Sequence, residues 1–323
     1  MAQVETVRGP VDVADLGQVL AHEHLFTIST EIRDNYPDYP STWDEDERVA
    51  DAVAKLKDVT TRGVRTIVDP TVIGLGRYIP RVQRINEQVD INIIVATGIY
   101  TYHDEPVQFH FTGPGRIFDQ PEPMVELFVN DIRNGIAGTG VKAGVLKCAI
   151  DEAGLTPGVE RVMRAVAATQ VETGTPAIVH THAGLEMGLV AIEVFKSEGA
   201  DLSKVVIGHS GDSADIDYLR KVADTGALLG MDRFGIDVYA TTEVRVNTVA
   251  ELVRLGYAES MVLAHDASCW TDFFPDPAPV LPNWHFNHIH DDVLPALRER
   301  GVTDDQIDTM LVKNPARYFG GVA

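Results

Sequence analysis

Short apolar runs and helical segments alternate along the chain. Runs rich in β-branched and aliphatic residues recur at 19–24, 65–70, 91–98, 143–149, 176–182, 204–210, 227–232 and 261–266. Between most of them, apolar residues recur with the period of an α-helix, at 47–63, 121–136, 158–174, 184–199 and 213–226. Strands that are almost continuously apolar are typical of a parallel sheet covered by helices on both faces. The pattern predicts an α/β protein, and eight such strands favour a closed (β/α)8 TIM barrel.

The pattern continues without interruption over the whole chain. No low-complexity tract or charged linker divides the 323 residues, and α/β barrels of this length commonly form one domain. We therefore expect a single barrel domain over residues 1–323. No Gly-x-Gly-x-x-Gly sequence follows the first strand, which disfavours an open sheet that binds a dinucleotide.

Charge and composition exclude several classes of protein. The 48 acidic and 27 basic residues give a formal net charge of −21, which repels nucleic acid and anionic membrane surfaces. The chain contains neither an apolar run long enough to span a bilayer nor a basic segment and apolar run typical of a signal peptide. Two cysteines without Cys-x-x-Cys spacing fit a reducing compartment. We expect a cytoplasmic protein with no nucleic-acid or membrane partner.

Residues able to bind a metal lie where the predicted strands end. Side chains two apart on a strand share a face, so the histidines of VLAHEHLFT (19–27) are expected to point the same way. In a barrel the C-terminal ends of the strands converge on the face that carries the chemistry. A metal centre is therefore predicted there, and its candidate ligands are His22, His24, Lys147, His180, His209 and Asp266.

Lys147 is unusual in such a set, because its ammonium ion would repel divalent cations. A lysine shielded from water can lose its proton, and the neutral amine can then combine with CO2 to give a carbamate whose two oxygens bridge two metals. A lyase that forms a Schiff base at Lys147 is an alternative, although four histidines argue against chemistry that needs no metal. A metal-binding barrel without catalytic activity is a second alternative.

The segment after the eighth strand, 268–287, is rich in proline and aromatic residues. It is either a surface loop packed on its own side chains or a wall of the substrate site, since loops at barrel strand ends commonly carry function. In the second case Trp270, Phe273, Phe274 and Trp284 could form an apolar channel for an acyl chain. The histidines of HFNHIH (285–290) are expected to be solvated or packed within the loop rather than to bind metal.

The ordered motifs resemble those of one known family. They are HEH (22–24), TIVDPTVIGLGR (66–77), TGIY (97–100), AGVLKCA (143–149), His180, IGHSGD (207–212), GMDRFG (230–235), HD (265–266) and KNP (313–315). Nearly end to end, the chain resembles the phosphotriesterase family of the amidohydrolase superfamily, and within it the phosphotriesterase-like lactonases.

The resemblance implies an amidohydrolase-type barrel with two divalent metal ions. His22, His24 and Asp266 would bind the more buried ion, and His180 and His209 the more exposed one. Carbamylated Lys147 and a hydroxide would bridge the two ions. Zinc is the expected metal, but cobalt, manganese and iron accept the same ligands.

The resemblance also implies the reaction. The expected activity is metal-dependent opening of lactone rings, above all of N-acyl homoserine lactones (quorum quenching), with a side activity on phosphotriesters such as paraoxon. Tyr100 would lie beside the substrate carbonyl, Arg233 would position the substrate and the loops above it, and Asp266 would accept a proton. A dedicated hydrolase of aryl dialkyl phosphates is the alternative. Ala267 and Ser268, beside Asp266, depart from close lactonases and leave the substrate preference open. A homodimer is implied as well.

Overall fold

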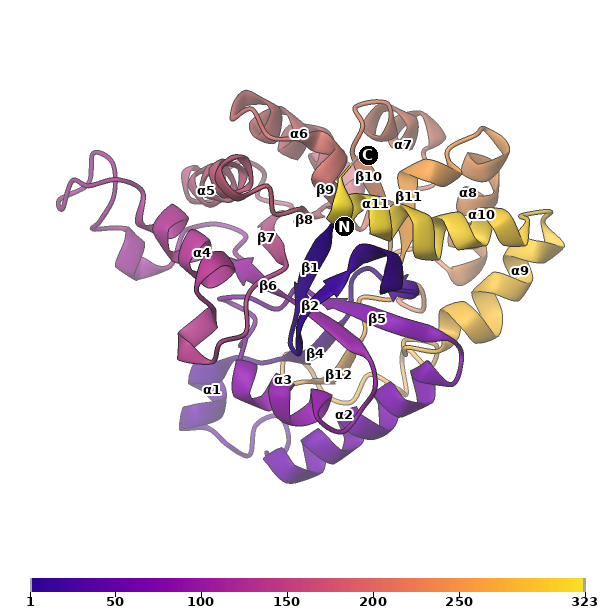
Figure 1. Cartoon of the computed structure of the whole chain (residues 1–323), viewed down its shortest axis with the longest axis horizontal. Helices are drawn as coiled ribbons and strands as arrows, with labels where there is room; N and C mark the ends of the chain where they lie inside the picture. Colours follow the sequence, from indigo (N-terminus) through magenta and orange to yellow (C-terminus); the bar gives the residue numbers. More distant parts are fainter. Residues whose placement is uncertain (1, 322–323) are drawn as a thin grey trace.

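The computed structural model describes residues 2–321 and contains a parallel eight-stranded sheet (Figure 1). Its strands pair in sequence order, and they are β3 (Gln18–Leu20), β5 (Val64–Asp69), β6 (Asn92–Gly98), β7 (Val145–Ile150), β8 (Ala177–Thr181), β9 (Val205–Gly208), β10 (Leu228–Met231) and β11 (Met261–Leu263). The Ala21 amide, just after β3, donates a 3.1 Å hydrogen bond to the Leu263 carbonyl at the end of β11. This bond joins the two edges of the sheet, so the predicted TIM barrel is confirmed.

Helices surround the strands in Figure 1. They are α1 (Thr30–Asn35), α2 (Glu45–Thr60), α3 (Ile79–Asn86), α4 (Pro123–Arg133), α5 (Pro157–Thr173), α6 (Met187–Ser197), α7 (Ile216–Ala223), α8 (Thr242–Arg254), α9 (Leu294–Glu299), α10 (Asp304–Asp308) and α11 (Asn314–Gly320). Several begin at a side chain that accepts backbone N–H groups of the first turn, such as Asp44 of α2 and Thr156 of α5. Within the described residues, no helix is long and apolar enough to cross a membrane.

The inside of the barrel is filled by apolar side chains contributed by the strands. They are Val19, Val68, Ile94, Ala96, Val145, Ile178, Val206, Leu228 and Val262, all at most 3% exposed. Val4 of β1 (Gln3–Thr6) and Tyr318 and Phe319 of α11 belong to the same cluster. β1 pairs with β2 (Gly9–Asp12), and this hairpin and α11 lie on the viewer's side in Figure 1. Because side chains fill the barrel, the polar groups of the candidate site are confined to the opposite end.

The prediction of one continuous strand over 19–24 is wrong, because the structure divides this stretch into two strands. β3 ends at Leu20, the chain bends over residues 21–23, and β4 (His24–Thr27) begins at His24. β4 pairs in parallel with β12 (Ser268–Thr271), outside the barrel ladder, with Ser268 opposite His24. Simple alternation therefore does not set the directions of His22 and His24, and their convergence depends on the bend.

Candidate metal centre

The six predicted ligands come together at the C-terminal ends of the strands. The Nε2 atoms of His22 and His24 each lie 3.3 Å from Oδ1 of Asp266. Nδ1 of His180, in β8, lies 2.7 Å from Nε2 of His209, which directly follows β9. Nζ of Lys147 lies 3.3 Å from Nε2 of His22. Residues far apart in the sequence thus place nitrogen and oxygen donors around one small volume.

Each ligand histidine is fixed through its other ring nitrogen. Nδ1 of His22 and Nδ1 of His209 donate to the two carboxylate oxygens of Asp232, at 3.1 and 2.8 Å. Nε2 of His180 donates to Asp151 at 2.5 Å. With the proton on the outer nitrogen, the inner nitrogen keeps the lone pair that a metal requires.

His24 is oriented by a relay rather than directly by a carboxylate. Its Nδ1 lies 2.7 Å from the Thr71 hydroxyl, and that hydroxyl donates to Asp69 at 2.5 Å. The Thr71 oxygen therefore accepts the proton of His24, and Nε2 of His24 faces Asp266. Burial lowers the pKa of His24, but the hydrogen bonds and charges of Asp266 and Asp69 outweigh it and raise that pKa to about 9.

Among residues 2–321, two groups of three side chains bring ligand atoms close enough to bind one ion. The group of His22, His24 and Asp266 turns the two Nε2 atoms and Oδ1 of Asp266 toward one another, and a bound metal would take the place of the proton that the raised pKa leaves on His24. The group of His22, His209 and Asp232 does not suit a metal, because the oxygens of Asp232 already accept both ring N–H groups and the backbone N–H of His209. The donors that remain, imidazole nitrogen and carboxylate oxygen, fit zinc and the neighbouring transition metals.

Lys147 is buried in the wall of the centre, with 1% of its surface exposed. Burial lowers its pKa to about 8, against the raising effect of the Asp266 and Asp232 charges. No carboxylate oxygen of the described residues forms a salt bridge with its amine. A lysine held this way has a neutral fraction near neutral pH, which is the form that can be carboxylated.

Arg233 follows β10 and contacts the second oxygen of Asp266. Its Nε donates to Asp266 Oδ2 at 3.1 Å, and its Nη1 donates to Asp212 at 2.9 Å. Asp212 is held in turn by the buried Arg245, at 2.8 Å. Burial acts to raise the pKa of Asp266, but His22, His24 and Arg233 hold it well below its usual range. Asp266 is therefore an ionised carboxylate with one oxygen toward the histidines and the other toward Arg233.

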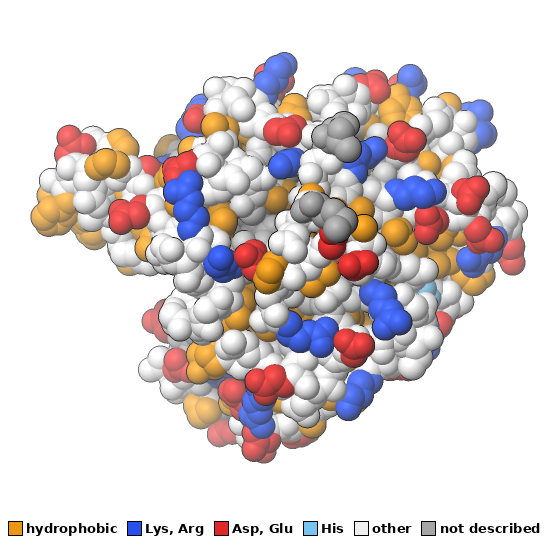
Figure 2. Space-filling model, viewed as in Figure 1, with side chains coloured by type: hydrophobic (Ala, Val, Ile, Leu, Met, Phe, Trp, Pro, Cys, Tyr) orange, Lys and Arg blue, Asp and Glu red, His pale blue; other side chains and the backbone are white. Residues whose placement is uncertain are grey.

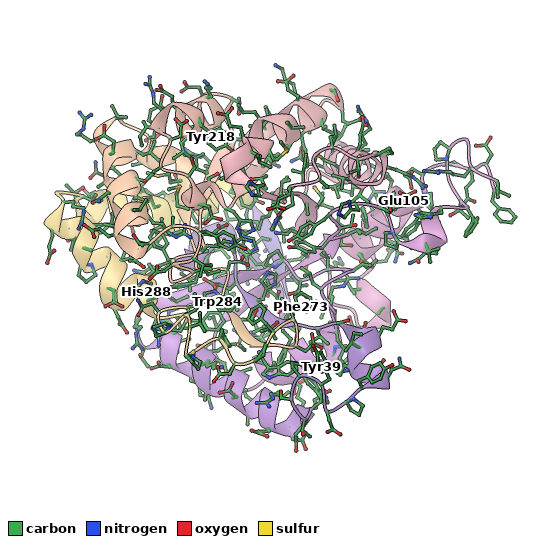
Figure 3. All side chains as sticks on the ribbon, turned by 180° about the vertical axis from the view of Figure 1, so that it is seen from behind. Tyr39, Glu105, Tyr218, Phe273, Trp284 and His288 are labelled. Carbon is green, nitrogen blue, oxygen red and sulfur yellow. The ribbon has the colours of Figure 1, made fainter. Side chains whose placement is uncertain are left out.

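A cavity of about 520 Å³ opens from these groups. Its apolar wall comes mainly from two loops, through Ile236, Val238, Phe273, Phe274, Val280, Leu281 and Trp284. Figure 3 shows the face opposite to that of Figure 1, with Phe273 and Trp284 near its middle. Trp270 is not part of this wall, because it packs edge to face on Trp43 at 4.9 Å. Of the two departures beside Asp266, Ser268 lines the cavity and Ala267 is buried.

Tyr100 lines the cavity next to the histidines. Its hydroxyl lies 3.5 Å from Nδ1 of His180 and is hydrogen-bonded to the hydroxyl of Tyr102. Burial raises the pKa of Tyr100 well above its usual value. The hydroxyl therefore keeps its proton and can donate a hydrogen bond to a molecule in the cavity.

Sequence analysis missed the groups that orient the ligands. Asp151, Asp232 and Thr71 each contact a ligand histidine, yet none belongs to a metal-binding motif. The available signal was position: Asp151 and Asp232 each come directly after a strand, β7 and β10. The histidines of HFNHIH do not line the cavity; His288, for example, is buried, with its Nε2 2.9 Å from the Thr242 hydroxyl.

The fold is a (β/α)8 barrel, and four histidines and an aspartate lie together at the ends of its strands. This combination is typical of metal-dependent hydrolases of the amidohydrolase type. A sequence model of the Phosphotriesterase family matches residues 2–319, and the chain belongs to that family.

Relatives support this placement over the full length. The solved phosphotriesterase of Mycobacterium tuberculosis is 55% identical, with a TM-score of 0.96 over 99% of this chain and 100% of that one. An aryldialkylphosphatase of Saccharolobus solfataricus is 38% identical over 96% of both chains. A mutant of the phosphotriesterase-like lactonase of Deinococcus radiodurans is 32% identical, with a TM-score of 0.89 over 98% of this chain and 100% of that one.

Proposed function

We propose that this chain forms a single barrel domain with a binuclear metal centre that opens lactone rings, with N-acyl homoserine lactones as main substrates and phosphotriesters as secondary ones. The observation that carries this proposal is the protonated Tyr100 hydroxyl beside His180, at the base of an apolar cavity. The names of two relatives, a phosphotriesterase-like lactonase and an aryldialkylphosphatase, are consistent with both activities.

The inward-facing atoms support the proposed metal ligands. His22, His24 and Asp266 would hold one ion, and His180 and His209 the other, with carboxylated Lys147 as a further ligand. Zinc is proposed first, and cobalt, manganese or iron would be accepted by the same donors. Two bound cations would supply an acidified water and polarise a carbonyl or phosphoryl oxygen.

The chain's own residues would then complete the reaction. Tyr100 would donate a hydrogen bond to the substrate carbonyl oxygen, where negative charge develops. Asp266, ionised in the free protein, would take the proton of the attacking water and transfer it to the leaving alkoxide oxygen, which yields a hydroxy acid. Arg233 would keep the Asp266 carboxylate in the required orientation. The loop carrying Phe273 and Phe274 would cover the acyl chain.

A comparison of two substrates tests the proposal. Acid release from an N-acyl homoserine lactone and phenol release from an aryl phosphotriester would be followed with native, chelator-stripped and metal-restored protein. We expect metal-dependent turnover of both, with the lactone faster. Tyr100→Phe should slow the lactone reaction more than the phosphotriester reaction, whereas Tyr239→Phe, also on the cavity wall, should affect both little. A faster phosphotriester reaction would make a dedicated organophosphate hydrolase the function.

Carboxylation of Lys147 has a separate test. Metal-free protein would be reconstituted in CO2-free buffer with and without added bicarbonate. We expect bicarbonate to increase both metal uptake and activity. Equal reconstitution in the two buffers would argue against a carbamate, and borohydride trapping of a carbonyl substrate on Lys147 would favour the lyase.

We also propose a homodimer. The segment between β6 and α4 projects from the barrel and carries exposed apolar side chains at Val107, Phe111, Ile117 and Phe118, 47–78% exposed. Figure 2 shows apolar side chains gathered at the tip of this projection. Arg161 donates hydrogen bonds to the carbonyls of Phe109 and Thr112, both at 2.6 Å, and so fixes the base of this segment. The tip of the segment therefore stays exposed. Light scattering should show a dimer that Ile117→Asp weakens.

A further inference from the structure

Glu23 stands between two metal ligands but takes no part in the reaction described above. It is fully buried and does not line the cavity. Within the described residues, its carboxyl group is hydrogen-bonded to donors of one short segment: the backbone N–H and Nδ1 of His265, at 2.8 and 2.6 Å, and the backbone N–H of Ala267, at 3.0 Å. The two carboxyl oxygens accept all three bonds; burial raises the pKa of Glu23, and the backbone bonds from His265 and Ala267 act against that rise.

These bonds flank the metal ligand Asp266 on both sides. Asp266 has a φ of +53°, a left-handed conformation that residues other than glycine seldom adopt. Its own N–H donates to the carbonyl of His22 at 3.0 Å. Three successive N–H groups, 265 to 267, are therefore held by residues 22 and 23. The segment that supplies two histidine ligands also fixes the backbone that presents the aspartate ligand.

His265 extends the contact to the loop that forms the cavity wall. Because its Nδ1 donates to Glu23, its Nε2 has a free lone pair, and this accepts the N–H of Ile289 at 2.9 Å. The indole N–H of Trp284 lies 3.1 Å from the carbonyl oxygens of both His265 and Asp266. Both ends of the segment Trp284–Ile289 are thus anchored on the residues that carry the metal ligand.

We propose that Glu23 and His265 are a pair of positioning residues. Glu23 holds Asp266 in the conformation that binds metal, and His265 anchors the cavity loop, at residues 284–289, to the same segment. Neither side chain lines the cavity, so both act through Asp266 and the loop. The proposal rests on the metal centre proposed above, but it does not depend on which substrate is hydrolysed.

Glu23→Gln tests the first half. The amide keeps the shape of the side chain but turns an N–H group toward another N–H, so one backbone bond is lost. We expect metal affinity, measured by competition with a chelator, to fall about 10- to 100-fold, as for other groups that support metal ligands. The visible spectrum of the cobalt-substituted protein should also change, because it reports on the geometry of the ligands.

A matched control separates positioning from general stability. Asn86 is the buried last residue of α3 and donates to the carbonyls of Val89 and Ile91, just before β6 begins, at the opposite end of the barrel. Asn86→Leu should lower the unfolding temperature but leave the metal affinity and the cobalt spectrum unchanged. If Glu23→Gln behaves like Asn86→Leu in all three measurements, the proposal is overturned.

His265→Asn tests the second half. The asparagine amide can still donate toward Glu23, but it is too short to reach the N–H of Ile289, which bonds the far ring nitrogen of His265. We expect unchanged metal affinity, altered tryptophan fluorescence and a higher KM for long-chain substrates at similar kcat. Unchanged fluorescence and KM would refute the role of His265.

If Glu23→Gln does not fold, Glu23→Asp, which keeps the charge but has a shorter reach, should show the same weaker metal binding. Wild-type protein that binds no metal would instead refute the metal centre itself.

Discussion

Asp151 offers a direct test of how the metal centre is organised. Its carboxylate accepts the Nε2 proton of His180 at 2.5 Å, and His180 is 2% exposed. Asp151→Ala removes the group that keeps this proton on the outer nitrogen. The ring could then hold its proton on Nδ1, the atom that faces His209. The predicted result is loss of the ion bound by His180 and His209, with the ion at His22, His24 and Asp266 retained.

The size of the effect follows from the contact. A hydrogen bond to a charged group contributes about 1.5–3 kcal/mol, and each 1.36 kcal/mol corresponds to a tenfold change in an equilibrium constant. The full range is therefore about 13- to 160-fold in metal affinity. The Asp151 side chain is 19% exposed, so water replaces part of the lost bond. We accordingly expect the lower half of the range, about 10- to 50-fold.

The assay is the number of metal ions retained per chain as a chelator is titrated against the folded protein. Glu152→Ala is the matched control, because it removes a neighbouring carboxylate that is 82% exposed and contacts no metal ligand. Asp151→Ala should retain one ion where the wild type and Glu152→Ala retain two. Equal retention by the two variants would refute the assignment of Asp151 as the group that orients His180.

Three further predictions concern the cavity, the pH dependence of stability and the lysine. Each CH2 that a longer acyl chain buries contributes about 0.8 kcal/mol, so kcat/KM should rise up to about fourfold per added CH2 until the cavity is filled. Phe274→Ala should reduce this increase with chain length. An equal increase in the wild type and the variant would contradict the acyl-chain site. Burial lowers the pKa of His290 to about 4, so between this value and 6.5 the unfolded chain binds more protons. Unfolding of the metal-free protein should therefore become easier as pH falls through this window, and less so in His290→Gln; identical pH profiles would argue against it. Lys147→Met should abolish the bicarbonate effect on metal uptake, and a persisting effect would place the carboxylation elsewhere.

The fold was predictable because its determinants are local and repeated. Each strand is a short apolar run and each helix an amphipathic segment, and only a closed barrel covers eight such strands in sequence order. The same topology made the ligand set predictable. Once Lys147 and His180 were assigned to strands, their position near the C-terminal ends followed without any knowledge of their contacts.

The orienting groups were not predictable in this way. An aspartate after a strand is common, and nothing in the sequence distinguishes Asp151, which contacts His180, from Asp69, which acts through Thr71. The bend at residues 21–23 was missed because it depends on bonds between Glu23 and a segment more than 240 residues away. Contacts of this kind are set by tertiary structure, so a local pattern cannot indicate them.

Three of the strand ends leave the extended conformation at the functional residue itself. His209, Arg233 and Asp266 have φ values of +62°, +62° and +53°. In an extended strand each side chain would continue the alternation between barrel interior and helix layer, whereas a left-handed residue turns its side chain across the mouth of the barrel. Each such residue costs about 1–3 kcal/mol, against a net stability of about 5–15 kcal/mol for a typical protein. Bonds specific to this site offset the cost: the N–H of His209 to Asp232 at 2.9 Å, and that of Asp266 to the His22 carbonyl. The groups that orient the metal ligands thus also stabilise the backbone that presents them, so removing one should impair metal binding and folding together.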